Sequence, residues 1–251
     1  MRKIVLITGA TKGIGEGCAK KFAEGGYDII ATGRDSAKLA ELEICLKELG
    51  ADVKTLCFDV RDRKACEEAV ASLDGKWTNV DILINNAGLA LKLDKEYQAD
   101  MDDWDTMIDT NIKGLLTMTR LIVPGMVDRN KGQVINIGSL AGDYAYGGGG
   151  VYCGTKAAVK AITDGLRIDL AHTPIRVTNI KPGLVETNFS ITRFGGDKER
   201  AAKVYEGVKP LTGKDIAEVV FFCASAPEHV QIAEVLITAT HQANSFVLCR
   251  E

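Results

Sequence analysis

Two side chains that could transfer a proton together, Tyr152 and Lys156, lie four residues apart in the sequence. Residues 157–162 after them are typical of a helix, and positions i and i+4 lie on the same face of a helix. A lysine cation beside a tyrosine hydroxyl favours the phenolate, so we expect Lys156 to lower the pKa of Tyr152 from about 10. A pair with this spacing is most often two surface side chains, and the rest of the sequence must distinguish the two interpretations.

A hydroxyl group, that of Ser139, comes before this pair at the end of an apolar run. Residues 133–139 are typical of a buried strand. A hydroxyl donor at a strand end that faces Tyr152 and Lys156 would complete a small proton-handling site.

The composition is that of an ordinary globular protein. The chain has 251 residues, of which 46% are hydrophobic and 26% charged, and its formal net charge is -3. It has no long basic run, which argues against a nucleic-acid or membrane-surface binder. No apolar stretch approaches the length of a membrane span, and the apolar run at residues 4–7 is too short for a signal peptide, so we expect a cytoplasmic protein.

The seven cysteines show no metal-binding or disulfide pattern. They are scattered along the chain without CxxC or CxxH spacing. We therefore expect free thiols, with neither disulfides nor a metal centre.

A glycine-rich turn follows the first expected strand. Residues 4–7 are continuously apolar, residues 8–15 contain three glycines, and a helical pattern then runs to Gly25. Glycines allow a sharp turn and let a pyrophosphate approach the free N–H groups at the start of the helix. The order of strand, turn and helix therefore indicates a dinucleotide site, and the alternative is a tight turn without a ligand.

The end of the second expected strand, residues 28–34, indicates which dinucleotide would bind. An acidic residue there would bind the ribose 2′-hydroxyl of NAD, but this chain has Arg34, whose planar fork suits the 2′-phosphate of NADP. Lys12 adds a second positive charge. Asp35 would repel a phosphate if it pointed inward, but we expect it to cap the next helix. The alternative for Arg34 is a solvated surface charge.

Strand and helix patterns alternate to the end of the chain. Further strands are expected at residues 53–58, 80–84, 133–139, 176–180 and 234–238, and further helices at 39–49, 63–73, 104–127, 152–171 and 215–224. The pattern predicts an α/β fold with one doubly wound parallel sheet and helices on both faces, as a single domain over residues 1–251. The charged segment 185–209 reads as a mobile helical lid over the strand ends.

Two polar residues in this pattern have open roles. Asp59, after the third strand, would accept from an adenine amino group or cap the next helix. Asn111 lies inside a long helical region, where asparagine is unfavourable, so it would bend the helix or hold a water molecule.

Several spaced motifs together resemble the short-chain dehydrogenase/reductase family. Residues 8–15 match its TGxxxGxG turn and residues 85–88 its NNAG strand end. Pro182, Gly183 and Thr187 match PGxxxT on the nicotinamide side. The resemblance implies a Rossmann-type fold and the catalytic tetrad Asn111, Ser139, Tyr152 and Lys156. It implies cofactor contacts at Gly9, Thr11, Lys12, Gly13, Ile14, Gly15, Arg34, Asp59, Val60, Asn86, Ala87, Gly88, Tyr152, Lys156, Pro182, Gly183, Val185 and Thr187.

A narrower resemblance covers residues 86–91, 103–104, 106–111, 124–130 and 135–139, which look like the NADP-dependent 3-hydroxy acid dehydrogenases, a group that includes serine and allo-threonine dehydrogenases. The part after about residue 230 fits this group less well. The resemblance implies reversible hydride transfer between NADP and the hydroxyl-bearing carbon of a 3-hydroxy acid. It also implies a homotetramer with helices 104–127 and 152–171 at an interface.

The resemblance also implies a role for each member of the tetrad. Tyr152 would be the general acid/base, and Lys156 would hold the nicotinamide ribose. Ser139 would hydrogen-bond the substrate oxygen, and Asn111 would hold a water.

The substrate side remains open. A 3-hydroxy acid carries a carboxylate, and Arg193 in the charged lid could pair with it in bidentate fashion. The alternative is a surface arginine. Two other functions stay open: an enzyme of the same family acting on a ketone, sugar or acyl thioester, and a non-catalytic NADP-binding sensor, which the intact tetrad disfavours.

Overall fold

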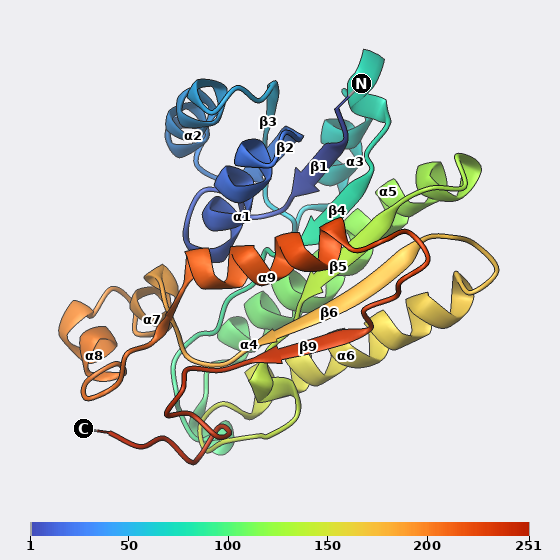
Figure 1. Ribbon diagram of the computed structural model, residues 1–251. Coiled ribbons are helices and arrows are strands. Elements are labelled where there is room, and N and C mark those ends of the chain that lie inside the picture. Colours follow the sequence, from blue (N-terminus) through green and yellow to red (C-terminus); the bar gives the residue numbers. More distant parts are fainter. Residues whose placement is uncertain (1, 251) are drawn as a thin grey trace.

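The computed structural model describes residues 2–250, in which short strands alternate with helices (Figure 1). The strands are β1 (Ile4–Ile7), β2 (Asp28–Gly33), β3 (Val53–Cys57), β4 (Ile82–Asn85), β5 (Gln133–Ile137), β6 (Arg176–Pro182), β7 (Val185–Glu186), β8 (Leu211–Thr212) and β9 (Glu234–Ile237). The α-helices are α1 (Gly13–Glu24), α2 (Ser36–Glu48), α3 (Arg63–Ala71), α4 (Met101–Ile108), α5 (Leu115–Asp128), α6 (Gly150–Asp169), α7 (Asn188–Arg193), α8 (Lys198–Lys203) and α9 (Gly213–Ser225). Shorter helical turns are η1 (Gly75–Thr78), η2 (Glu96–Gln98), the π-helical η3 (Asp109–Gly114) and η4 (Leu140–Gly142).

One parallel sheet of seven strands has the order β3-β2-β1-β4-β5-β6-β9. Strand β1 pairs with β2 on one side and β4 on the other, so the order reverses direction at β1. Ligands of such sheets bind outside the carboxyl ends of the strands at this reversal. The doubly wound Rossmann-type sheet expected from the sequence is confirmed, and its ligand-binding edge lies beyond Ile7 and Asn85.

Successive side chains of β1 supply two separate cores. Val5 and Ile7 pack with α1, α2 and α9 on one face, whereas Ile4 and Leu6 pack with α3 and α5 on the other. All four are at most 2% exposed. Figure 1 shows α1 and α9 together on one side of the sheet. Helices on both faces explain why the strands are apolar throughout instead of alternating.

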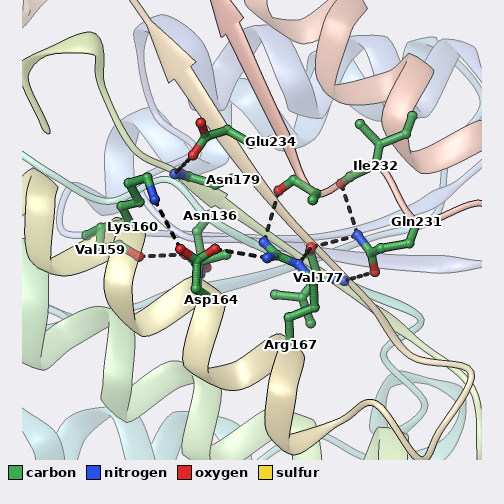
Figure 2. A network of polar contacts seen from close by, with 12 residues as sticks. Asn136, Val159, Lys160, Asp164, Arg167, Val177, Asn179, Gln231, Ile232 and Glu234 are labelled. Atoms are coloured by element: carbon green, nitrogen blue, oxygen red, sulfur yellow. Dashed lines mark hydrogen bonds and ion pairs between the residues drawn. The ribbon is translucent and has the colours of Figure 1, made fainter. Parts of the chain in front are cut away.

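Polar contacts fix helix α6 against the sheet edge (Figure 2). Asp164 pairs with Lys160 at 3.1 Å and with Arg167 at 2.9 Å. Arg167 in turn donates to the backbone carbonyls of Val177 on β6 and Ala233 beside β9, each at 3.1 Å. These bonds hold the helix that carries Tyr152 in one place over the sheet.

A row of asparagines crosses three neighbouring strands of the sheet near their carboxyl ends. Asn85, Asn136 and Asn179 are partners in the register of β4, β5 and β6. Asn85 donates to Asn136 at 2.9 Å, and Asn136 donates to Thr163 of α6 at 2.9 Å. Asn179 faces Glu234 of β9 at 3.3 Å (Figure 2). The row ties α6 to the strand that leads to Ser139.

The long helical region expected over residues 104–127 is divided. Helix α4 passes into the π-helical segment η3, which contains Asn111, before α5 begins. A π-helical turn widens the helix, and such turns are frequent at functional sites. Asn111 thus lies where the helix type changes, and the expected bend stays a prediction.

Some boundaries differ from those expected. Strand β4 begins two residues later than expected and ends one residue later, at Asn85, and β6 continues through Lys181 to Pro182, where we expected a break. Pairing with β9 extends β6, since Pro182 is in register with Ile237 and Gly183 donates to the Ile237 carbonyl at 2.8 Å.

The segment expected to form a helical lid has two short helices, α7 and α8, and also strand β7, which pairs with β8 just after the segment. All seven cysteines are free thiols. Among residues 2–250, no helix combines the length and the apolar character that a membrane span requires.

Candidate active site

The glycine-rich turn between β1 and α1 is built so that only glycine fits at its key positions. Gly9 and Gly13 have φ of 64° and 59°, in the left-handed region that favours glycine. At Gly15 a Cβ atom would lie 2.3 Å from the Gly9 carbonyl oxygen and 2.5 Å from Asn86 Nδ2. The turn therefore leaves bare backbone at the start of α1, as a phosphate site requires.

Side-chain hydrogen bonds join this turn to the end of β4. Thr8 Oγ1 accepts from the backbone N–H groups of Asn86 and Ala87, both at 3.0 Å. Asn86 Nδ2 donates to the carbonyls of Thr8 at 2.9 Å and Gly9 at 3.0 Å. The two strand ends that flank the sheet reversal are thus held as one rigid wall.

Positive charges gather where the second strand ends. Arg34 is half-exposed there, with Nη1 3.4 Å from Asp59 Oδ2. Burial lowers the pKa of Lys12, and the nearby charges of Lys38 and Arg34 lower it further. Arg61 holds the same Asp59 carboxylate at 2.8 Å. Arg34 and Arg61 share one carboxylate, and Lys12 lies near Arg34, so this corner attracts an anion.

The two acidic residues beside this corner behave differently. Asp35 accepts from the Lys38 backbone N–H at 3.1 Å and caps α2, as expected, so it does not point inward. The helix-cap interpretation of Asp59 is wrong, because Asp62 caps α3 and the Asp59 side chain instead accepts from Arg61. The adenine contact of Asp59 stays a prediction.

Ser139 follows β5 and faces the neighbouring strand end. Its Oγ accepts from the Ala141 N–H at 3.1 Å and lies 3.5 Å from the Pro182 carbonyl. It lines the same cavity as Tyr152 and acts on that hydroxyl by lowering its pKa. The hydroxyl pair expected from the sequence is therefore brought together.

Tyr152 and Lys156 lie on the buried face of α6, 7% and 6% exposed. The Lys156 ammonium donates to the Ile137 carbonyl at 2.8 Å and lies 6.0 Å from the centre of the Tyr152 ring. The pair is thus a buried one, and the interpretation as two surface side chains is excluded by its burial.

The expected effect of Lys156 on Tyr152 is wrong for this structure. Burial raises the pKa of Tyr152, while the Arg193 charge and the Ser139 hydroxyl act in the opposite direction. Burial also lowers the pKa of Lys156 to about 8. Desolvation exceeds the attraction, because the ammonium is directed at the Ile137 carbonyl instead of the phenol oxygen.

Asn111 braces the loop beside this group from behind. Its side chain accepts from the Leu89 N–H at 2.9 Å and donates to the Leu89 carbonyl at 2.8 Å and to Thr155 at 3.0 Å. A Cβ atom placed on Gly88 would lie 3.3 Å from Asn111 Oδ1 and 3.4 Å from Lys156 Nζ. Asn111 and Lys156 therefore flank the same point next to Gly88.

Arg193, at the end of α7, is directed into the site. Its guanidinium lies 5.1 Å from the Tyr152 ring centre and 5.0 Å from that of Phe189. Nη2 donates to the Tyr146 hydroxyl at 2.7 Å, whereas Nε is buried without a hydrogen-bond partner. The surface-arginine interpretation does not fit this position.

One cavity of about 440 Å³ joins these parts. Of the residues expected from the sequence, it is lined by Gly9, Thr11, Lys12, Gly13, Ile14, Arg34, Asp59, Val60, Asn86, Ala87, Gly88, Ser139, Tyr152, Lys156, Pro182, Gly183, Val185, Thr187 and Arg193. Gly15 and Asn111 do not line it. Gly15 is packed under the turn, and Asn111 lies behind Leu89, so both support the wall instead of forming it.

The sequence did not reveal several further lining residues. Tyr146 lies in the loop before α6, Tyr205 lies in the lid, and Gln242 and Ser245 lie in the C-terminal segment. Gln242 Oε1 accepts from the Leu184 N–H at 2.7 Å, which places that segment over the strand ends. No periodicity or motif marks these positions, since only the tertiary fold brings them to the cavity.

The sequence also matches a family of known proteins. A model of the family described as short chain dehydrogenase matches residues 3–196. The chain belongs to the short-chain dehydrogenase family. It is therefore an oxidoreductase of that family, which acts on CH–OH groups.

Named relatives cover almost the whole chain. The NADP-dependent 3-hydroxy acid dehydrogenase YdfG of Salmonella typhi is 52% identical over 92% of this chain and 93% of its own. The serine 3-dehydrogenase of Agrobacterium fabrum is 42% identical over 97% of this chain and 96% of its own. Both similarities include the C-terminal region beyond the family model.

Solved structures agree with this assignment. The closed form of a serine dehydrogenase complexed with NADP+ has a TM-score of 0.93 and 46% identity, covering 99% of both chains. Serine dehydrogenase from Escherichia coli has a TM-score of 0.83 and 44% identity, covering 96% of this chain and 99% of its own.

Proposed function

We propose that this short-chain dehydrogenase is an NADP-dependent 3-hydroxy acid dehydrogenase, acting on a substrate such as serine, allo-threonine or 3-hydroxypropionate. The observation that carries the proposal is the single cavity that runs from the glycine-rich turn past Ser139 and Tyr152 to Arg193. The reaction requires a bound dinucleotide and a bound substrate carboxylate. The end of the cavity at the glycine-rich turn suits the dinucleotide, and the end at Arg193 suits the carboxylate. The named relatives act on the same class of compound.

The residues at the strand ends fit NADP. Gly9 and Gly13 present bare backbone at the start of α1, and Lys12 and Arg34 supply positive charge where a 2′-phosphate would lie. Asp59 and Val60 would lie beside the adenine, and Pro182, Gly183 and residues 185–187 beside the nicotinamide.

The protein's own contribution to the reaction is proton transfer and orientation. Bound NADP supplies the acceptor or donor of the hydride. Tyr152 takes the proton of the substrate hydroxyl in oxidation and returns it in reduction. Ser139 donates a hydrogen bond to the substrate oxygen. Lys156 holds the ribose and, with Asn111, a water beside Gly88.

Arg193 would bind the substrate carboxylate. Its guanidinium faces the cavity beside Tyr152, and no carboxylate among residues 2–250 forms an ion pair with it. A partly buried cation without a counter-ion is costly, and a carboxylate ligand offsets part of that cost. Arginine can take both oxygens of a carboxylate and so fix the hydroxyl-bearing carbon near Tyr152.

Assembly, lid motion and location complete the proposal. Exposed apolar side chains on the helices of the expected interface, Leu116 (43%) on α5 and Ile168 (75%) on α6, favour a homotetramer. Light scattering during gel filtration measures the subunit number.

We propose a single domain with residues 185–209 as its mobile lid. Free thiols persist in a reducing compartment, which supports the cytoplasm.

A substrate panel with both cofactors tests the function. L-serine, D-serine, L-allo-threonine and 3-hydroxypropionate should be oxidised with NADP and poorly with NAD, as followed by the absorbance of the reduced cofactor. Turnover of simple ketones, sugars or acyl thioesters in preference to all of these acids would contradict the proposal, as would NADP binding without any turnover.

A further inference from the structure

The hydroxyl of Tyr146 lies in contact with the guanidinium of Arg193. Arg193 Nη2 donates to the Tyr146 oxygen at 2.7 Å, and both side chains line the same cavity. The backbone of the lid is held as well, since the Arg193 carbonyl accepts from the Lys92 N–H at 2.8 Å. The position of Arg193 is therefore fixed from both ends.

The glycine-rich loop before α6 is shaped around the Tyr146 ring. A Cβ atom on Gly149 would lie 2.1 Å from that ring, and the Gly149 N–H donates to the Tyr146 carbonyl at 3.0 Å. Gly148 has φ of 72° and packs against the Leu93 carbonyl. Because Gly148 and Gly149 carry no side chains, the Tyr146 ring can pack against their backbone and reach the cavity. A loop that faced only solvent would not need this close packing.

The guanidinium is enclosed by aromatic rings. The centres of the Tyr146, Tyr152 and Phe189 rings lie 5.7, 5.1 and 5.0 Å from Cζ of Arg193. These contacts support the cation but supply no negative charge. One nitrogen, Nε, is buried with no hydrogen-bond partner, so the arrangement is incomplete until an acceptor binds.

Tyr146 has a proton available for the same acceptor. Its oxygen accepts from Arg193, so its own O–H can donate elsewhere. Burial raises the pKa of Tyr146 above its usual range, which keeps the hydroxyl protonated. The Cys153 thiol lies near this hydroxyl, and its sulfur is only a weak acceptor.

We propose that Tyr146 and Arg193 form a two-residue carboxylate clamp in which the guanidinium and the Tyr146 hydroxyl donate to the same substrate carboxylate. Tyr146 then determines specificity, selecting 3-hydroxy acids over neutral alcohols of the same size. This inference rests on the proposed function of the cavity and adds a residue to it.

The variant Tyr146→Phe removes only the hydroxyl and tests the clamp. We compare 3-hydroxypropionate with its neutral amide, 3-hydroxypropanamide, in the NADP-saturated enzyme. The acid should lose about tenfold more kcat/KM than the amide, mostly through a higher KM, since one hydrogen bond to a charged group is lost. Tyr144→Phe, an exposed tyrosine outside the cavity lining, is the matched control. Equal losses for acid and amide would overturn the clamp.

Binding of an unreactive carboxylate separates the clamp from the proposed function. Propionate should bind the enzyme–NADP complex, and Tyr146→Phe should weaken its Kd about tenfold while the thermal midpoint stays that of the wild type. If no 3-hydroxy acid is turned over but propionate binds in this way, the proposed function fails and the clamp stands. Failure of the wild type to bind propionate, or equal binding by the variant, overturns the clamp.

Discussion

The guanidinium carbon of Arg193 lies 5.1 Å from the centre of the Tyr152 ring, closer than the ammonium of Lys156 at 6.0 Å. The lid residue is thus the nearer cation to the ring of Tyr152, the proposed general base. The contact links two functions that sequence motifs treat separately, the binding of substrate and the ionisation of Tyr152.

Replacement of Arg193 should change the pH dependence of oxidation. The Arg193 charge lowers the pKa of Tyr152 against the dominant effect of burial, so Arg193→Ala should raise that pKa. Oxidation needs the phenolate as base, and the acid limb of the kcat/KM profile should therefore move to higher pH. Measurement with the neutral 3-hydroxypropanamide avoids the effect of carboxylate binding. Arg200→Ala, which alters an exposed lid arginine stacked on Phe194, should leave the limb in place; an unmoved limb in Arg193→Ala would contradict the account.

Replacement of Arg34 should change cofactor preference. The variant Arg34→Asp removes a cation beside Lys12 and adds a carboxylate that repels a 2′-phosphate and suits a 2′-hydroxyl. The ratio of kcat/KM for NADP to that for NAD should fall by about 10- to 100-fold. Arg63→Asp changes the same charge at a side chain that is 82% exposed and paired with Glu67, and it should leave the ratio unchanged. A ratio that stays constant in Arg34→Asp would place the phosphate elsewhere.

Two glycine-to-alanine changes should have opposite effects on stability. In Gly15→Ala the new Cβ would collide with the Gly9 carbonyl, which should cost roughly 1–3 kcal/mol and weaken NADP binding. In Gly165→Ala, within α6, nothing lies within 4 Å, and alanine should stabilise the helix by about 0.5–1 kcal/mol. Urea unfolding measures both. Equal effects of the two changes would show that the turn is not as tightly packed as described.

The buried lysine should make stability depend on pH. Lys156 has a pKa of about 8 in the folded protein, below its ordinary value of 10.5. Below about pH 8 the folded and the unfolded protein both carry the proton of Lys156. The folded protein then bears the full cost of burying a charged ammonium group. Between about pH 8 and 10.5 the unfolded chain still binds the proton that the folded protein has lost, so stability rises with pH.

The variant Lys156→Met isolates this effect. The free energy of unfolding of the wild type, minus that of the variant, should increase by roughly 3 kcal/mol from pH 8 to 10.5. Urea unfolding of both proteins across this range gives the difference. Parallel curves would show that the lysine has an ordinary pKa.

The sequence predicted the sheet and the dinucleotide end well because local patterns carry that information. Apolar runs marked the buried parallel strands, and the glycines of residues 8–15 marked a turn that only glycine can form. Asp35 was correctly interpreted as a helix cap. These features depend on residues close together in the chain.

The substrate end was predicted less completely, because it is assembled from distant segments. Tyr146, Tyr205 and Gln242 reach the cavity from three separate parts of the chain. The raised pKa of Tyr152 also depends on tertiary burial, which the spacing of Tyr152 and Lys156 does not encode. A sequence pattern shows which ionisable side chains are present. The desolvation that shifts their pKa depends on all the atoms packed around them in the folded protein.

The central claim is that Tyr152 transfers the proton of the substrate hydroxyl while NADP accepts or donates the hydride. In Tyr152→Phe, oxidation of 3-hydroxypropionate should fall by about 100- to 10,000-fold, the usual contribution of a general acid–base group, while the Kd for NADPH in a fluorescence titration stays close to that of the wild type. Turnover within a few-fold of the wild type, with NADPH bound equally well, would contradict it.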